Sequence, residues 1–246
     1  MSVNIYVMPL GRFKSGDFES PLQQVFGADN VTRVTPDGIK RRPEPETISE
    51  TLELLVAADE FRLVRQFLDR AASQMSLEPQ ALQWTDEGDT HFAEQAVYLG
   101  AASTYAHWLS HQDEYPVFEV PDPDDFESHP VWHLVDDPSS TSYPHLGLHD
   151  HYVGYYLPCD FPRMLEMATG YDGYPCDRSI GSSYRLRDEL AEVGKTLDLI
   201  WQSGVGLVDE CDERAPVLDQ VSAALVQLSR AAEASCKHGL PIIFDG

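Results

Sequence analysis

The stretch His145–Phe161 reads HLGLHDHYVGYYLPCDF and joins a histidine-rich lead-in to a compact apolar segment. Tyr152–Leu157 is the apolar part, and aromatic and β-branched residues of this kind favour strands. We therefore predict a buried strand at Tyr152–Leu157 and expect the rest of the fold to be arranged around it.

Charge is distributed unevenly upstream of this strand. Residues 71–162, here called the acidic window, contain no lysine or arginine but hold 16 of the 41 acidic residues and 8 of the 9 histidines. The window therefore carries −16 of the formal net charge of −24. Such a surface repels nucleic acids and anionic membranes and attracts cations. We expect no nucleic-acid and no membrane partner, whereas a divalent metal or a basic protein fits. The alternative is that the charge serves solubility alone.

Composition indicates a globular chain. The 246 residues are 42% hydrophobic, enough for one sizeable core. The N-terminal residues MSVNIYVMPLGRFKSG lack the basic start and longer apolar run of a secretory signal, and the four cysteines form no CxxC pair. We expect a cytoplasmic protein with reduced thiols.

Hydrophobic periodicity predicts an α+β fold: a helix-rich single domain (1–246) packed on a small mixed sheet. The sheet should include the N-terminal strand, Tyr152–Leu157 and the C-terminal strand. Predicted strands are Val3–Met8, Val31–Thr35, Tyr152–Leu157 and Leu240–Phe244. Predicted helices are 20–27, 47–71, 79–84, 91–111, 161–169, 181–203 and 212–238. Between them, a proline-rich acidic loop region occupies about 112–144, with short extended pieces at 117–120 and 131–135.

His145, His149 and His151, with Asp150 among them, are candidate metal ligands. Imidazole and carboxylate groups bind borderline divalent ions such as zinc. On a strand, the H-x-H pair would place both rings on one side, and His145 could fold back from the loop. The spacing matches neither HExxH nor a zinc finger. The alternative is a set of loop histidines hydrogen-bonded to nearby acids.

Three further constellations have simpler explanations. His107 and His111 are spaced for a metal, but their place at a helix C-terminus favours charged rings that stabilise the helix dipole. Cys159 lies near histidines, yet neighbouring acids should raise its thiol pKa and make it a poor nucleophile. Gly181-Ser182-Ser183 opens a helix and could bind an anion, with Arg178, Arg185 and Arg187 nearby; an ordinary N-cap with acid-paired arginines is favoured.

The acidic window is also a candidate interaction surface. Tyrosines, which are common at interfaces, surround its end: Tyr143, Tyr152, Tyr155, Tyr156, Tyr171 and Tyr174. The alternative is a set of solvated loops. If all its histidines titrate near about 6.5, the window moves from −16 towards −8 on mild acidification.

Three segments resemble a group of uncharacterised bacterial proteins: YVMPLGRFKSGDF (6–18), GYYLPCDF (154–161) and IGSSYRLRDEL (180–190). In that group, a histidine- and aspartate-bearing lead-in precedes a YYVPxDF-like strand, and a GSS helix follows. The resemblance implies no particular activity and no catalytic residues. Some acidic bacterial proteins of this general size and charge are immunity or inhibitor proteins.

Our leading hypothesis is a non-enzymatic cytoplasmic acidic protein, without a cofactor, that binds a basic protein partner and is immunity- or inhibitor-like. The alternative is a metal-dependent hydrolase that uses the His/Asp cluster at 145–151.

Overall fold

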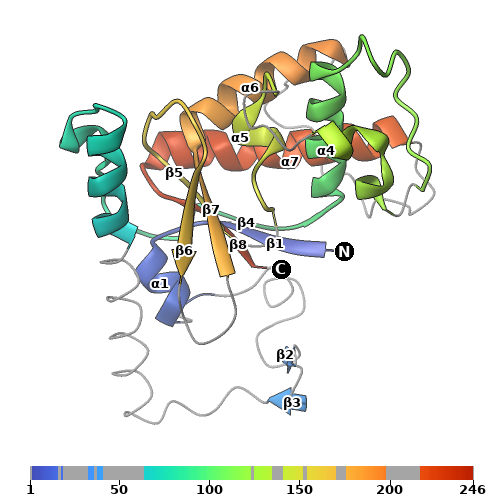
Figure 1. The fold of residues 1–246 in the computed structure, drawn as a ribbon. Coiled ribbons are helices and arrows are strands. Elements are labelled where there is room, and N and C mark those ends of the chain that lie inside the picture. Colours follow the sequence, from blue (N-terminus) through green and yellow to red (C-terminus); the bar gives the residue numbers. More distant parts are fainter. Residues whose placement is uncertain are drawn as a thin grey trace.

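A six-stranded mixed sheet with helices on both faces forms the centre of the molecule (Figure 1). This confirms the predicted α+β class. The computed structural model describes residues 2–15, 18, 33–35, 38–40, 64–122, 125–134, 141–151, 154–169, 176–197 and 217–245. Within these residues, no helix is both long and apolar enough to cross a membrane.

The elements are as follows. The strands of the sheet are β1 (Ser2–Val7), β4 (Phe92–Val97), β5 (Gly154–Leu157), β6 (Leu165–Thr169), β7 (Cys176–Ser182) and β8 (Ile242–Asp245), and β2 (Arg33–Thr35) and β3 (Gly38–Lys40) form a separate hairpin. The α-helices are α1 (Leu10–Ser15), α4 (Leu99–Ser110), α5 (Pro144–Gly147), α6 (Ser183–Thr196) and α7 (Val217–His238), and residues 64–74 are also helical. Short 3₁₀ helices are η2 (Pro79–Leu82), η3 (Phe126–Ser128) and η4 (Pro130–Leu134).

The strand order is β4-β1-β8-β5-β7-β6. Only the β5–β7 pairing is parallel among the pairings of this sheet. The N-terminal strand, the C-terminal strand and β5 are therefore neighbours, as predicted. Every residue of β5 is buried, as expected for a strand covered on both faces.

Alternating side chains divide the apolar residues between two cores, because successive residues of a strand point to opposite faces. On one face, Ile5 of β1 and Tyr156 of β5 pack against α4, α6 and α7, which lie together above the sheet in Figure 1. On the other face, Tyr6 and Tyr155 pack against α1 and the helical residues 64–74. The predicted apolar faces of α6 and α7 are buried, although Leu218 is 47% exposed.

The predicted helix 91–111 is wrong in its first third. Phe92–Val97 forms β4, which pairs along its length with β1, and Tyr98 adopts a left-handed conformation (φ 61°) between strand and helix. Alanine, glutamate and glutamine in this stretch favour a helix, but pairing with the open edge of β1 outweighs that preference. The remainder, α4, has the small buried face expected of an inner helix.

The structure differs from the sequence-based expectation at three other places. Residues 161–169 were expected to be helical, but 165–169 form β6, which pairs with the unpredicted β7. The extended pieces at 117–120 and 131–135 do not pair with the sheet in their described part, and 130–134 form η4. No helix was predicted at Leu10–Ser15, but this segment is helical, because the Asp86 carboxylate accepts hydrogen bonds from the N–H groups of Leu10 (2.6 Å) and Gly11 (2.8 Å).

The remaining predictions are confirmed as far as the described residues reach. Residues 33–35 form β2, 64–71 are helical, and 79–82 form η2. The helix predicted at 212–238 is described from Val217 and ends at His238, before Gly239 (φ 68°). The helix predicted at 20–27, the first part of 47–71 and the last residues of 181–203 lie outside the described residues.

Gly154 should be essential for the entry into β5. Its φ is 116°, and an added Cβ would collide with the backbone oxygen of Ser179 in β7. We expect Gly154→Ala to lower the free energy of unfolding by about 3 kcal/mol in urea titrations. Gly239→Ala is the matched control: it also has a positive φ, but open space surrounds the new Cβ, so the cost should be about 1 kcal/mol. Equal losses in the two variants would contradict this account.

Candidate functional site

The histidine-rich lead-in runs from α5 to the start of β5 and is buried. His145, His149 and His151 are 1%, 4% and 5% exposed, respectively. None lies on a strand, so the expected alternation of an H-x-H pair does not apply.

His151 takes part in a buried hydrogen-bond chain. The Tyr156 hydroxyl donates to the carbonyl of His145 (2.6 Å), and its oxygen lies 3.3 Å from Nε2 of His151. On the other side of the ring, the Ser103 hydroxyl donates to the Leu146 carbonyl (3.1 Å), and its oxygen lies 3.0 Å from Nδ1 of His151. The neutral ring carries one proton, so it donates to one of these two hydroxyls and accepts from the other.

The other two rings bind different parts of the backbone. His149 Nε2 lies 3.2 Å from the Tyr155 carbonyl, and its ring stacks on Tyr156 with centroids 4.0 Å apart. His145 Nδ1 accepts the N–H of Ser182 (3.0 Å) at the start of α6. These partners are backbone groups and hydroxyls rather than the acids of the alternative reading.

The structure brings the rings of His149 and His151 within 5.3 Å, centroid to centroid. Across the residues it describes, no group of three or more histidine, cysteine or acidic side chains is placed to hold a metal ion. The metal site predicted at His145, His149 and His151 stays a prediction.

Burial keeps these histidines neutral. It lowers the pKa of His145 to about 4 and of His151 to about 3, and it holds that of His149 well below the usual value. It also lowers the pKa of His107 to about 4, while Nε2 of that ring contacts the Gly147 carbonyl at 2.8 Å. The expected rise of the acidic window towards −8 is therefore wrong, because at least half of its histidines stay neutral on mild acidification.

The same burial corrects the role expected for His107. A neutral, fully buried ring cannot stabilise the helix dipole as an imidazolium does. His111, by contrast, occupies the C-cap position of α4, and its Nδ1 lies 3.7 Å from Glu114.

A cleft of about 840 Å³ opens beside Ser103, His149 and His151. The Ser103–His151 contact has the pairing of a nucleophile and its base. A useful general base, however, has a pKa near the operating pH, and burial lowers that of His151 to about 3. Acid–base chemistry at neutral pH is therefore a poor fit to this pair.

Glu189 of α6 holds α5 in place. Its carboxylate accepts the N–H groups of His145 (3.2 Å) and Leu146 (2.8 Å). Burial raises its pKa to about 7, although the two backbone donors act in the opposite direction. Sequence reasoning missed Ser103 and Glu189, since each lies more than 40 residues from its partner in the chain. It also missed the Tyr156 hydroxyl, because the pattern of the strand indicates only that the ring is buried.

Cys159 and the segment Gly181-Ser182-Ser183 have structural roles. Burial raises the pKa of Cys159 to about 12, so the expected shift is confirmed, but burial rather than neighbouring acids causes it. Ser182 is the N-cap of α6 and accepts the N–H of Arg185 (3.2 Å), as the N-cap reading predicts. The Arg185 side chain binds Asp160 (2.7 Å), and that of Arg187 binds Asp188 (2.9 Å).

The tyrosines of β5, which were expected to border an interaction surface, are not exposed. Tyr155 and Tyr156 are 2% and 0% exposed and belong to the two cores, whereas Tyr143 is partly buried. Tyr152, Tyr171 and Tyr174 lie outside the described residues.

The acids of the window, in contrast, are at the surface. Those exposed are Glu78, Glu87, Asp89, Asp113, Glu114, Glu119, Asp122, Asp125, Glu127, Asp150 and Asp160. Six of them belong to what we call the acidic loop, residues 113–127, described at 113–122 and 125–127. Arginines from elsewhere reach other acids of the window: Arg12 binds Asp89 (3.1 Å) and Arg230 binds Glu94 (2.7 Å).

Residues that lie between the acids of the acidic loop attach this loop to α4. Trp108 Nε1 donates to the Tyr115 carbonyl (2.6 Å), and Phe118 packs edge-on against Tyr105. Thr104 Oγ1 donates to the Phe126 carbonyl (3.3 Å), and Phe126 is 7% exposed. The loop is therefore held at several points, with its carboxylates left facing solvent.

The buried histidines should make stability depend on pH. A histidine with a folded pKa below its unfolded value of about 6.5 stabilises the protein above that pH, and this stability is lost as the pH falls towards the folded pKa. His107, His145, His149 and His151 each contribute at most about 1.4 kcal/mol per pH unit in this range. Glu189 acts in the opposite direction below its pKa of about 7, but with one proton. We expect the free energy of unfolding in urea to be several kcal/mol lower at about pH 5.5 than at about pH 7.

Single variants test the source of that dependence. In His107→Gln, the amide can still donate to Gly147, so the loss between the two pH values should shrink by about 1 kcal/mol. His133→Gln changes an exposed histidine and should leave the loss unchanged. A protein equally stable at both pH values would show that the buried rings are not held neutral.

The chain was compared with protein families, curated proteins and solved structures. One family model, described as "Putative DNA-mimic protein", matches residues 1–244. No curated protein and no solved structure matches. Since the family model covers nearly the whole chain, this acidic protein belongs to the family described as "Putative DNA-mimic protein".

Proposed function

We propose that this protein binds the nucleic-acid-binding surface of a basic protein and acts there as a mimic of DNA. The observation that carries the proposal is the separation of charge in the acidic window: most of its described acids are exposed, it contains no lysine or arginine, and five of its histidines are buried, with pKa values that burial lowers. Membership of the DNA-mimic family supports the same function.

Carboxylates can replace phosphates in this role. Proteins bind the DNA backbone through lysine and arginine side chains that form charge-assisted hydrogen bonds with anionic oxygens. The exposed carboxylates of the acidic loop offer oxygens of the same charge to the same side chains. The chain itself, with a net charge of −24, is repelled by DNA, so it would compete with DNA rather than bind it.

The anchoring of the acidic loop favours such binding. Ordering a free loop on association costs free energy, and a loop already attached to a helix avoids part of that cost. Trp108, Phe118 and Phe126 provide the attachment described above.

An inhibitor-like role follows from this proposal. A partner whose DNA-binding surface is covered cannot bind DNA, and no catalytic step is required. The metal-dependent hydrolase predicted as an alternative gains no support, because burial makes His151 a weak base and neutral rings already bond to backbone and hydroxyl groups.

Binding to a panel of purified DNA-binding proteins tests the function. We expect at least one to bind this protein, with a Kd that rises at least tenfold between about 50 and about 200 mM salt. Excess duplex DNA should displace the protein from that partner in fluorescence anisotropy. Binding that ignores both salt and DNA, or no binding across the panel, would contradict the proposal.

Matched charge variants locate the surface. Neutralising Asp113, Glu119 and Glu127 to the corresponding amides should weaken binding about tenfold or more and flatten its salt dependence. The control neutralises Glu192, Asp219 and Glu233, three exposed acids on α6 and α7, and changes the net charge equally. If the two triple variants bound alike, the acidic loop would not be the contact surface.

A further inference from the structure

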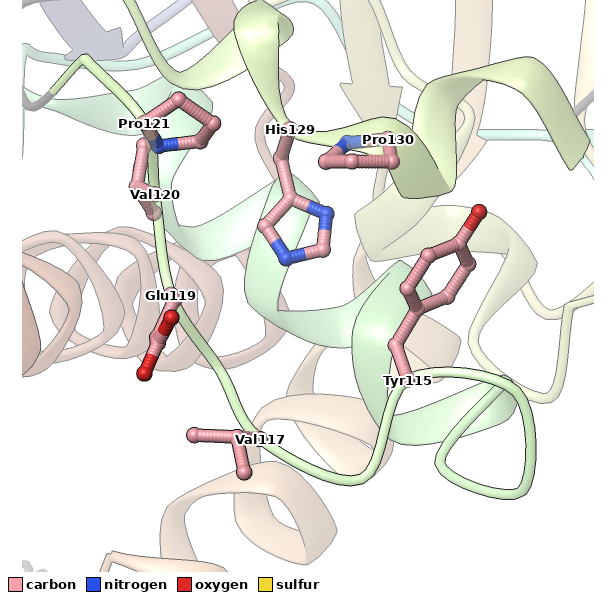
Figure 2. Close-up of a pocket in the computed structure, with 7 residues that line it drawn as sticks. All are labelled: Tyr115, Val117, Glu119, Val120, Pro121, His129 and Pro130. Atoms are coloured by element: carbon pink, nitrogen blue, oxygen red, sulfur yellow. The ribbon is translucent and has the colours of Figure 1, made fainter.

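A pocket of about 460 Å³ lies between the acidic loop and residues His129 and Pro130 (Figure 2). It is lined by Tyr115, Val117, Glu119, Val120, Pro121, His129 and Pro130. We call it the Val117 pocket. Val117 is 61% exposed, and only one other large apolar side chain among the described residues, Leu218 on α7, is classed as exposed.

His129 points into the Val117 pocket. Figure 2 shows its ring between Val120 and Pro121 on one side and Tyr115 and Pro130 on the other. The residue is 2% exposed, and its Nδ1 accepts the N–H of Val131 (3.1 Å). The neutral ring therefore carries its proton on Nε2, which has no hydrogen-bond partner among the described residues.

The ring is also fixed and uncharged. It stacks on Phe118 with centroids 5.5 Å apart and an angle of 24°, and burial lowers its pKa. A neutral ring does not repel a cation that enters the pocket. Its Nε2–H can donate to a peptide carbonyl of a bound chain.

These walls fit one kind of occupant. Val117, Val120 and the two prolines offer apolar surface, and Glu119 brings a carboxylate to the same pocket. Exposed Asp113, Glu114 and Asp122 add negative charge around it. Lysine and arginine combine an aliphatic stem with a cationic end, so they alone match both features.

We propose that the Val117 pocket binds a lysine or arginine side chain of the basic partner, with the aliphatic stem on Val117 and Val120 and the cationic end at Glu119. This inference rests on the proposed function and deepens it. DNA phosphates bind the cationic end alone, whereas this pocket also buries the stem. The protein thereby gains an apolar contact that its DNA competitor lacks.

Two basic peptides of equal length and charge test the pocket by isothermal titration calorimetry. One alternates lysine with glycine, and in the other diaminobutyric acid, which has a shorter stem, replaces lysine. We expect the lysine peptide to bind about fivefold more tightly to the wild-type chain. Val117→Ser should remove this difference while leaving the salt dependence of binding unchanged. Leu218→Ser is the matched control and should preserve the difference.

The outcomes separate the pocket from the function. Equal affinity of the two peptides for the wild type, or a preference that survives Val117→Ser, would overturn the pocket, while DNA-competed binding of a basic protein would still support the mimic. A neutral leucine–glycine peptide that binds as tightly as the lysine peptide would show a general apolar site instead and would also overturn the proposal. Unfolding curves for Val117→Ser and Leu218→Ser confirm that both variants are folded before they are compared.

Discussion

The hydrogen bond from the Tyr156 hydroxyl to the carbonyl of His145, 2.6 Å long, links the central strand to the segment that precedes it. Tyr156 belongs to β5, which lies between β8 and β7 and is buried along its whole length. Because the chain turns back at Gly154, the histidine-rich lead-in packs between β5 and α4 rather than into solvent. Each buried ring of the lead-in has a hydrogen-bond partner for at least one of its nitrogens, and Ser103, Ser182 and the Tyr155 carbonyl are these partners.

This arrangement separates the two kinds of titratable group in the acidic window. Imidazoles are neutral at little cost and can enter a core when hydrogen-bonded, whereas an unpaired carboxylate loses too much solvation free energy to follow them. The histidines of α4 and the lead-in are therefore inside, and the acids of the loops are outside. The surface keeps most of its negative charge under mild acidification, which suits a protein whose proposed partner is cationic.

The acidic loop shows how a segment with little regular secondary structure can still present a defined surface. Its aromatic residues lie between its acids without a regular spacing. The rings of Tyr115 and Phe118 contact α4 or His129. Because the loop is attached through these aromatic side chains, its carboxylates remain exposed to solvent. The Val117 pocket forms where the loop passes His129 and Pro130 (Figure 2).

The sequence alone determined the elements whose own residues form a periodic apolar face: β1, β5, β8, α6 and α7. It also determined the charge map, because the acids of loops have no alternative to solvent. Tertiary structure decided β4, β6 and α1, since edge strands are stabilised by pairing with distant strands and α1 begins at a carboxylate from Asp86. It likewise decided the state of the histidines. The sequence does not show which side chains are buried. Burial of His145, His149 and His151 lowers their pKa values through the free energy of desolvation, so these rings are neutral parts of the core.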